Sequence, residues 1–172
     1  MLSKKPVIRL CYGNPWSLHL HPFPEARFEK IAEVSNDCLF EARGEMSTRY
    51  LSPRTRYSVY IVFKTKSGYP EGFWDGGVPV RGTVALVGHE PCNRFLYFVE
   101  PSNGRKDREK ERRDGWMEAE LGDFFNKVSC DDAAISDVEI RGSHWKRGLI
   151  IQGMELRPVK TREIISWKKS YV

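Results

Sequence analysis

Glu118 and Glu120 are the residues whose type and spacing come closest to catalytic chemistry. In a strand they would project from one face about 7 Å apart, a separation that the two carboxylates of a glycosidase can adopt. The same spacing also arises on any solvated strand face. The sequence contains no GxSxG nucleophile motif and no glycine-rich phosphate-binding loop. We therefore predict that the protein is not an enzyme.

Histidines and cysteines do not form a recognisable metal-binding pattern. His19 and His21 would share one face of a strand, but no third ligand is evident beside them. The four cysteines lack CxxC spacing, and His89 with Cys92 has no second pair to complete a zinc site. We expect no metal, no cofactor, and free thiols that pack as small apolar groups. If one thiol is exposed, a disulfide between two subunits is an open alternative.

The composition fits one folded domain. With 172 residues and 40% hydrophobic content, the chain is long and apolar enough to bury a core. No apolar run approaches the roughly 20 residues that span a bilayer, so no membrane association is expected. The basic start, residues 1–6, is not followed by the apolar stretch of a secretory signal. The expected compartment is therefore the cytosol or the nucleus.

A formal net charge of +5 raises the question of a polyanionic partner. The densest charge run, residues 105–113, carries six bases and three acids. Interleaved acids disfavour a phosphate-binding stripe, which needs unopposed bases on one face. We predict a solvated loop for this run, although the overall charge can still attract polyanions nonspecifically.

The segment 114–125, DGWMEAELGDFF, is the clearest strand signal. An Asp-Gly turn opens it, and Met117, Ala119 and Leu121 then alternate with the side chains between them. Gly122-Asp123 is expected to end the strand. Trp116 falls on the same face as Glu118, which suggests that it covers a sheet edge.

Short strands account for most of the remaining chain. They are predicted at residues 7–12, 38–46, 57–64, 78–87, 94–99, 135–141 and 149–157. Residues 24–34 are expected to form a short helix or a loop that leads into a strand, and 142–148 a loop that carries Trp145. In the last strand, Ile150, Met154 and Leu156 are expected to share a face. Many short strands without helical crossovers predict an all-β, antiparallel β-sandwich.

Three blocks together resemble the phloem-protein-2 family of plants, which includes the Nictaba-type lectins: LSPRTRYSVYIVFK at 51–64, DGWMEAELGDFF at 114–125 and GLIIQGMELRP at 148–158. The resemblance spans roughly residues 7–158. It implies a jelly-roll-like lectin domain over residues 1–158, followed by a basic extension at 159–172. It also implies homodimers, and extends the expected location to phloem sap. Family members are often fused to an F-box; this chain is expected to be a stand-alone lectin domain.

The resemblance further implies a noncatalytic lectin for GlcNAc oligomers or for the GlcNAc-containing core of N-glycans. A sugar ring stacks on an aromatic side chain, and carboxylates and amides bind its hydroxyl and acetamide groups. The expected sugar contacts are Tyr12, Asn14, Trp16, Asp132, Glu139, Trp145 and Lys146. A second family tryptophan would fall near residues 10–12, where this chain has none. That loss leaves one alternative open, an interaction module for protein or RNA partners with a decayed sugar site.

Overall fold

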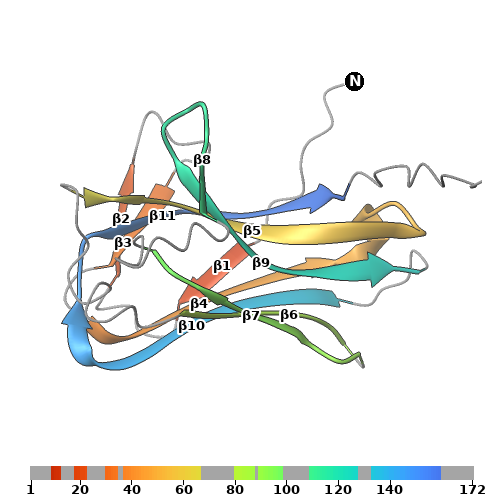
Figure 1. The fold of residues 1–172 in the computed structure, drawn as a ribbon, viewed down its shortest axis with the longest axis horizontal. Helices are drawn as coiled ribbons and strands as arrows, with labels where there is room; N and C mark the ends of the chain where they lie inside the picture. Colours follow the sequence, from red (N-terminus) through yellow and green to blue (C-terminus); the bar gives the residue numbers. More distant parts are fainter. Residues whose placement is uncertain are drawn as a thin grey trace, which may run out of the picture.

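The computed structural model describes residues 9–12, 18–22, 30–34, 37–66, 80–87, 89–98, 109–127 and 133–159. Within these ranges the chain forms two antiparallel sheets that lie face to face (Figure 1). A five-stranded sheet has the order β1-β4-β10-β6-β7, and a six-stranded sheet has the order β2-β3-β11-β5-β9-β8. The predicted all-β antiparallel sandwich is confirmed.

The strands interleave between the two sheets along the sequence. The five-stranded sheet contains β1 (Arg9–Tyr12), β4 (Asp37–Ser47), β6 (Val80–Leu86), β7 (Cys92–Leu96) and β10 (Ala133–Lys146). The six-stranded sheet contains β2 (Leu18–Pro22), β3 (Lys30–Val34), β5 (Thr55–Thr65), β8 (Glu109–Glu111), β9 (Met117–Asn126) and β11 (Leu149–Pro158). A single 3-10 turn, η1 (Thr48–Tyr50), connects β4 toward β5 in the described chain.

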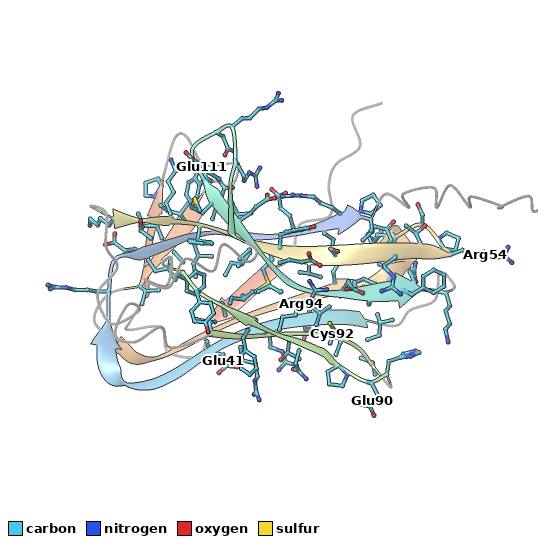
Figure 2. The ribbon with its side chains drawn as sticks, in the orientation of Figure 1. Glu41, Arg54, Glu90, Cys92, Arg94 and Glu111 are labelled. Atoms are coloured by element: carbon cyan, nitrogen blue, oxygen red, sulfur yellow. The ribbon has the colours of Figure 1, made fainter. Side chains whose placement is uncertain are left out.

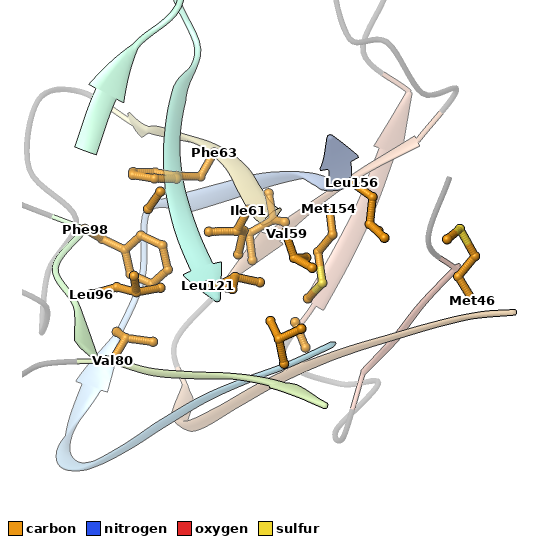
Figure 3. Packing of buried hydrophobic residues seen from close by; sticks show 14 of the residues in the cluster. Met46, Val59, Ile61, Phe63, Val80, Leu96, Phe98, Leu121, Met154 and Leu156 are labelled. Atoms are coloured by element: carbon orange, nitrogen blue, oxygen red, sulfur yellow. The ribbon is translucent and has the colours of Figure 1, made fainter. Parts of the chain in front are cut away.

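A hydrophobic core fills the space between the sheets (Figure 3). Alternation along β5 supplies Val59, Ile61 and Phe63, which are at most 1% exposed. Phe63 meets Phe98 edge to face, with ring centroids 4.8 Å apart. Because successive side chains of a strand point to opposite faces, each strand gives only every second residue to this layer.

The two sheets approach each other closely where β6 and β7 face β9. A Cβ atom on Gly122 would lie 3.0 Å from Val84 Cγ2 and 3.3 Å from the carbonyl oxygen of Cys92. The sequence suggested that Gly122-Asp123 ends the strand, but β9 continues to Asn126. A register irregularity at this point leaves Leu121 without a partner on β5, because Val59 pairs with Gly122 and Tyr60 with Glu120. Glycine is therefore used here for close sheet contact within a bulged strand.

Several other predicted boundaries are wrong, each for a tertiary reason. The charge run expected as a loop contains β8, a short edge strand that pairs with β9. β10 extends to Lys146, so Trp145 lies in a strand and not in a loop. Of the expected helix or loop at 24–34, residues 30–34 form β3, while 23–29 lie outside the described residues.

Ile150 does not share a face with Met154 and Leu156 as predicted. One extra residue, Gln152, interrupts the pairing of β11 with β5, because Ile151 pairs with Phe63 and Gly153 with Val62. This irregularity shifts the alternation along β11. Met154 and Leu156 therefore lie in the core between the sheets, whereas Ile150 packs against a separate cluster that contains Val62 and Trp116.

Trp116 belongs to a second, smaller hydrophobic cluster with Ile31, Val62 and the partly buried Ile150. Val62 alternates with core residues of β5, so this cluster lies on the outer face of the six-stranded sheet. The indole is 1% exposed, and Lys64 Nζ lies 4.7 Å from its ring centroid. Trp116 is thus a packing residue of the sheet face, not a cover of the sheet edge.

Candidate functional site

Four of the seven predicted sugar contacts lie in strands of the five-stranded sheet. Tyr12 is the last residue of β1, and Glu139, Trp145 and Lys146 lie in β10. Asn14, Trp16 and Asp132 are outside the described residues. No side-chain contact is therefore assigned to any of the seven, and the backbone register alone relates them.

That register brings the four strand positions into one part of the sheet. Tyr12 pairs with Ala42 of β4, and Ala42 also pairs with Val138 of β10, the neighbour of Glu139. Farther along, Lys146 pairs with Asp37. Five steps of β4 separate Ala42 from Asp37, which is about 16 Å at 3.3 Å per residue. Tyr12 pairs with the buried Ala42, whereas Glu139 pairs with the exposed Glu41, so these two positions belong to opposite faces of the sheet.

Asp132 precedes the start of β10, far along the strand from Glu139. Ala133, the residue after it, pairs with Ser47 at the opposite end of β4. Six residue steps along β10 lead from Ala133 to Glu139, which corresponds to about 20 Å. Asp132 stays a prediction, as do the other six expected contacts.

Position 139 belongs to a register row, by which we mean residues paired across neighbouring strands. Its partners are Glu41 of β4 and Arg81 of β6, and both side chains are exposed. The next row contains the buried residues Ala42 and Gly82. Because paired residues face the same side of a sheet, the row of position 139 is on the face turned away from the core. Figure 2 shows Glu41 on that outer side.

The carboxylate pair that suggested catalysis is held by arginines. Both oxygens of Glu118 accept hydrogen bonds from Arg157, at 3.0 and 2.6 Å. Glu120 forms an ion pair with Arg94 at 2.9 Å. Both carboxylates are thus tied to arginine side chains of the fold.

Glu118 is part of a larger ionic network on the outer face of the six-stranded sheet. Glu155, 3% exposed, accepts hydrogen bonds from Arg112 at 3.1 Å and from Arg157 at 2.9 Å. Burial alone would raise the pKa of Glu155, but the hydrogen bonds from Arg157 and Arg112 outweigh burial and lower the pKa to about 2. Arg157 also lies over the Tyr60 ring at 4.4 Å. Burial and the charge of Glu120 raise the pKa of Tyr60.

This network joins distant parts of the sequence. Arg112 follows β8, Glu118 comes from β9, and Glu155 and Arg157 come from β11. The strand alternation showed that Glu118 faces away from the core, but it gave no sign of which cations would meet it. Two arginines pair with two buried carboxylates, so removing either arginine would leave a buried charge uncompensated.

A second ionic cluster connects the two sheets. Arg94 of β7 lies between them (Figure 2), with Asp123 Oδ2 at 2.6 Å and Glu120 at 2.9 Å. Asp123 also accepts a hydrogen bond from Arg56 at 2.6 Å. Burial opposes the charged form of Arg94, but the charges of Glu120 and Asp123 and a hydrogen bond with Cys92 leave its pKa raised. These contacts hold the β6–β7 hairpin against β9.

The described residues offer no evident metal site. No group of three or more histidine, cysteine, aspartate or glutamate side chains is clustered there with metal-binding geometry. Cys92 is a half-buried free thiol. His19 and His21 do lie in strand β2, although their side chains are not among those described. In the same part of the chain, no helix has the length and hydropathy to cross a membrane.

Residues 1–158 match the family described as phloem protein 2. The chain belongs to this family. It is 57% identical over 169 residues to the putative F-box protein PP2-B2 of Arabidopsis thaliana, with 94% of this chain and 54% of that protein covered. It is 48% identical to the F-box protein At2g02240 and 43% identical to the F-box protein PP2-B10, both of Arabidopsis thaliana. Those two alignments cover 94% and 93% of this chain, and 52% and 60% of the relatives.

The chain thus spans about half the length of the curated relatives it matches. Among solved structures, it is similar to TmCBM61, determined in complex with β-1,4-galactotriose. That likeness has a TM-score of 0.46 and 12% identity over 88% of each chain. It is too distant to transfer a binding site.

Proposed function

We propose that this domain is a noncatalytic lectin that binds GlcNAc oligomers or the GlcNAc-containing core of N-glycans. The observation that carries the proposal is the family match over residues 1–158. Among the expected contacts, position 139 lies in a row whose described neighbours, Glu41 and Arg81, are exposed, so a ligand could reach it. Glycoproteins or free oligosaccharides would be the partners.

The proposed recognition combines two kinds of contact. Trp16, four residues after Tyr12 in the sequence, would stack on the apolar face of a sugar ring. Glu139 would accept hydrogen bonds from sugar hydroxyls, and its charge would strengthen them. Neither contact requires a metal, a cofactor or a proton transfer. The ion-paired state of Glu118 and Glu120 agrees with a function in binding and not in hydrolysis.

Trp16→Ala tests the aromatic contact. Removing a stacked aromatic ring should weaken chitotriose binding by on the order of 1–3 kcal/mol, judged by analogy with base stacking. The melting temperature should change little, because a ring that faces the ligand adds little to the core. Titration calorimetry and thermal unfolding of the same preparation measure both effects. A large fall in melting temperature would show that Trp16 packs in the fold.

Two further parts of the proposal concern the setting of the domain. A cytosolic or nuclear location remains a proposal for this domain. We also propose a homodimer, since strands β1, β7, β2 and β8 each end a sheet in the described chain. Edge strands carry unpaired backbone groups that can bind a second copy. Light scattering at several protein concentrations would measure the oligomeric state.

A further inference from the structure

The register row of position 139 continues to an exposed aromatic ring. From Glu41 on β4 the row passes through position 139 and Arg81 to Phe95 on the edge strand β7. Neighbouring strands lie about 4.8 Å apart, so the row is about 14 Å long from Glu41 to Phe95. This length is within the reach of a short oligosaccharide.

Phe95 faces away from the core. Its strand neighbours Arg94 and Leu96 point inward, to the ionic cluster on β9 and to the hydrophobic core respectively. Phe95 itself is 64% exposed. A large apolar ring held in a strand on a solvated face provides contact area that a sugar ring can cover.

Polar groups with a fixed orientation lie beside this ring. Asn93 is two residues before Phe95 on β7 and therefore lies on the same face. Thr83 Oγ1 donates a hydrogen bond to Asn93 Oδ1 at 2.7 Å. The bond uses the acceptor oxygen of the amide, so the amide N–H groups are the part of Asn93 that would meet a ligand.

The charge of this face favours a neutral ligand. Its exposed charged side chains in the described strands are two acids and two bases: Glu41, Glu45, Arg43 and Arg81. Arg43 and Glu45 lie within 3.8 Å of each other. A polyanion would require unopposed bases, and a stable protein interface would require more apolar area than Phe95 supplies. Neutral sugar hydroxyl groups suit mixed donors and acceptors around one ring.

We infer that the row from position 139 to Phe95 is an extended subsite for the same oligosaccharide. One sugar unit would lie near Glu139, and units farther along the chain would cross Arg81 and stack on Phe95. This inference rests on the proposed lectin function. It adds that the protein selects its ligands by length, because only longer oligomers reach Phe95.

Calorimetric titration with chitobiose, chitotriose and chitotetraose tests the subsite. The wild type should gain affinity from the dimer to the tetramer. Phe95→Ala should bind chitobiose as the wild type does but lose about fivefold to tenfold in affinity for chitotetraose. Phe95→Trp, with a larger ring, should retain or increase the preference for the tetramer.

Phe125→Ala is the matched control, because Phe125 is also an exposed aromatic of a strand, 42% exposed, on the six-stranded sheet. It should leave all three affinities unchanged. The inference is wrong if Phe95→Ala keeps the wild-type length dependence, or if Phe125→Ala loses as much; the lectin proposal would survive either result. No binding of any oligomer by the wild type would overturn both.

Discussion

Two carboxylates of this protein, Glu155 and Glu139, lie in different environments, and we expect different effects from their substitution. Glu155 is buried and accepts hydrogen bonds from two arginines. Position 139 lies in a row whose described neighbours are exposed. The first carboxylate should therefore matter for stability and the second for binding.

Glu155 should make stability depend on acid pH. Its pKa falls from 4.5 to about 2 in the folded protein. A lowered folded pKa stabilises the fold above the unfolded value, and this stabilisation is lost as the pH falls from 4.5 toward 2. Glu155→Gln should remove on the order of 3 kcal/mol of unfolding free energy at neutral pH, and the difference from wild type should shrink in acid.

Urea unfolding at a series of pH values measures this dependence. Glu90→Gln is the control, since Glu90 is exposed near the β6–β7 turn (Figure 2) and should leave the pH profile unchanged. A Glu155→Gln profile parallel to that of the wild type would mean that the network does not hold Glu155 in its charged form.

Substitutions of Glu139 should affect binding and not folding. Glu139→Gln keeps the shape but removes the charge that strengthens hydrogen bonds from sugar hydroxyls, so chitotriose affinity should fall about fivefold at neutral pH. Glu139→Ala should be worse, because the hydroxyls lose their partner. Calorimetry and thermal unfolding separate the two effects. Wild-type affinity in Glu139→Ala, or an unfolded variant, would assign Glu139 a structural role.

At the scale of elements, the bulged strand β9 controls how closely the sheets approach. Gly122→Ala would place a Cβ atom 3.0 Å from Val84 Cγ2 and 3.3 Å from the Cys92 carbonyl oxygen. We expect a loss of about 1–3 kcal/mol in unfolding free energy, measured by urea unfolding. Val84→Ala should relieve part of the clash, so the double variant should be more stable than the sum of the single effects predicts. Strict additivity would contradict a direct contact.

Sequence patterns identified most strands because alternation and β-branched residues report burial on one face. They failed where contacts from elsewhere in the chain decide the structure. β8 forms within a charge run because β9 offers it an edge to pair with. From sequence, Gly122 is expected to end the strand, because the close contact with Val84 of the other sheet cannot be seen there. From sequence, Trp116 is expected to cover a sheet edge, because its contacts with Ile31 and Val62 depend on the pairing of distant strands.

The candidate site rests on family resemblance and stays a prediction. The resemblance named Tyr12 and Glu139, which the register places in neighbouring rows that face opposite sides of the sheet. Phe95 could not be linked to them from sequence, because 44 residues separate positions 95 and 139 and only the pairing of β10, β6 and β7 connects them.

At the scale of the whole molecule, the ion pairs of the described residues leave the formal net charge of +5 unchanged, because each joins one base to one acid. Arg94, Arg112 and Arg157 are engaged by carboxylates within the two ionic clusters. They fix the β6–β7 hairpin and the turn after β8 against the sheets. Because they are paired with carboxylates, these three arginines do not form a stripe of unopposed bases such as phosphate binding needs.

Calorimetric titration of the wild-type protein with chitotriose at low and at high salt tests the lectin function most directly. Stacking and hydrogen bonds to a neutral sugar do not depend on released counterions, so the affinity should stay within about twofold between 50 mM and 200 mM salt. Absence of binding heat at both salt concentrations, together with RNA binding that persists at 200 mM salt, would contradict the lectin function and favour the interaction module.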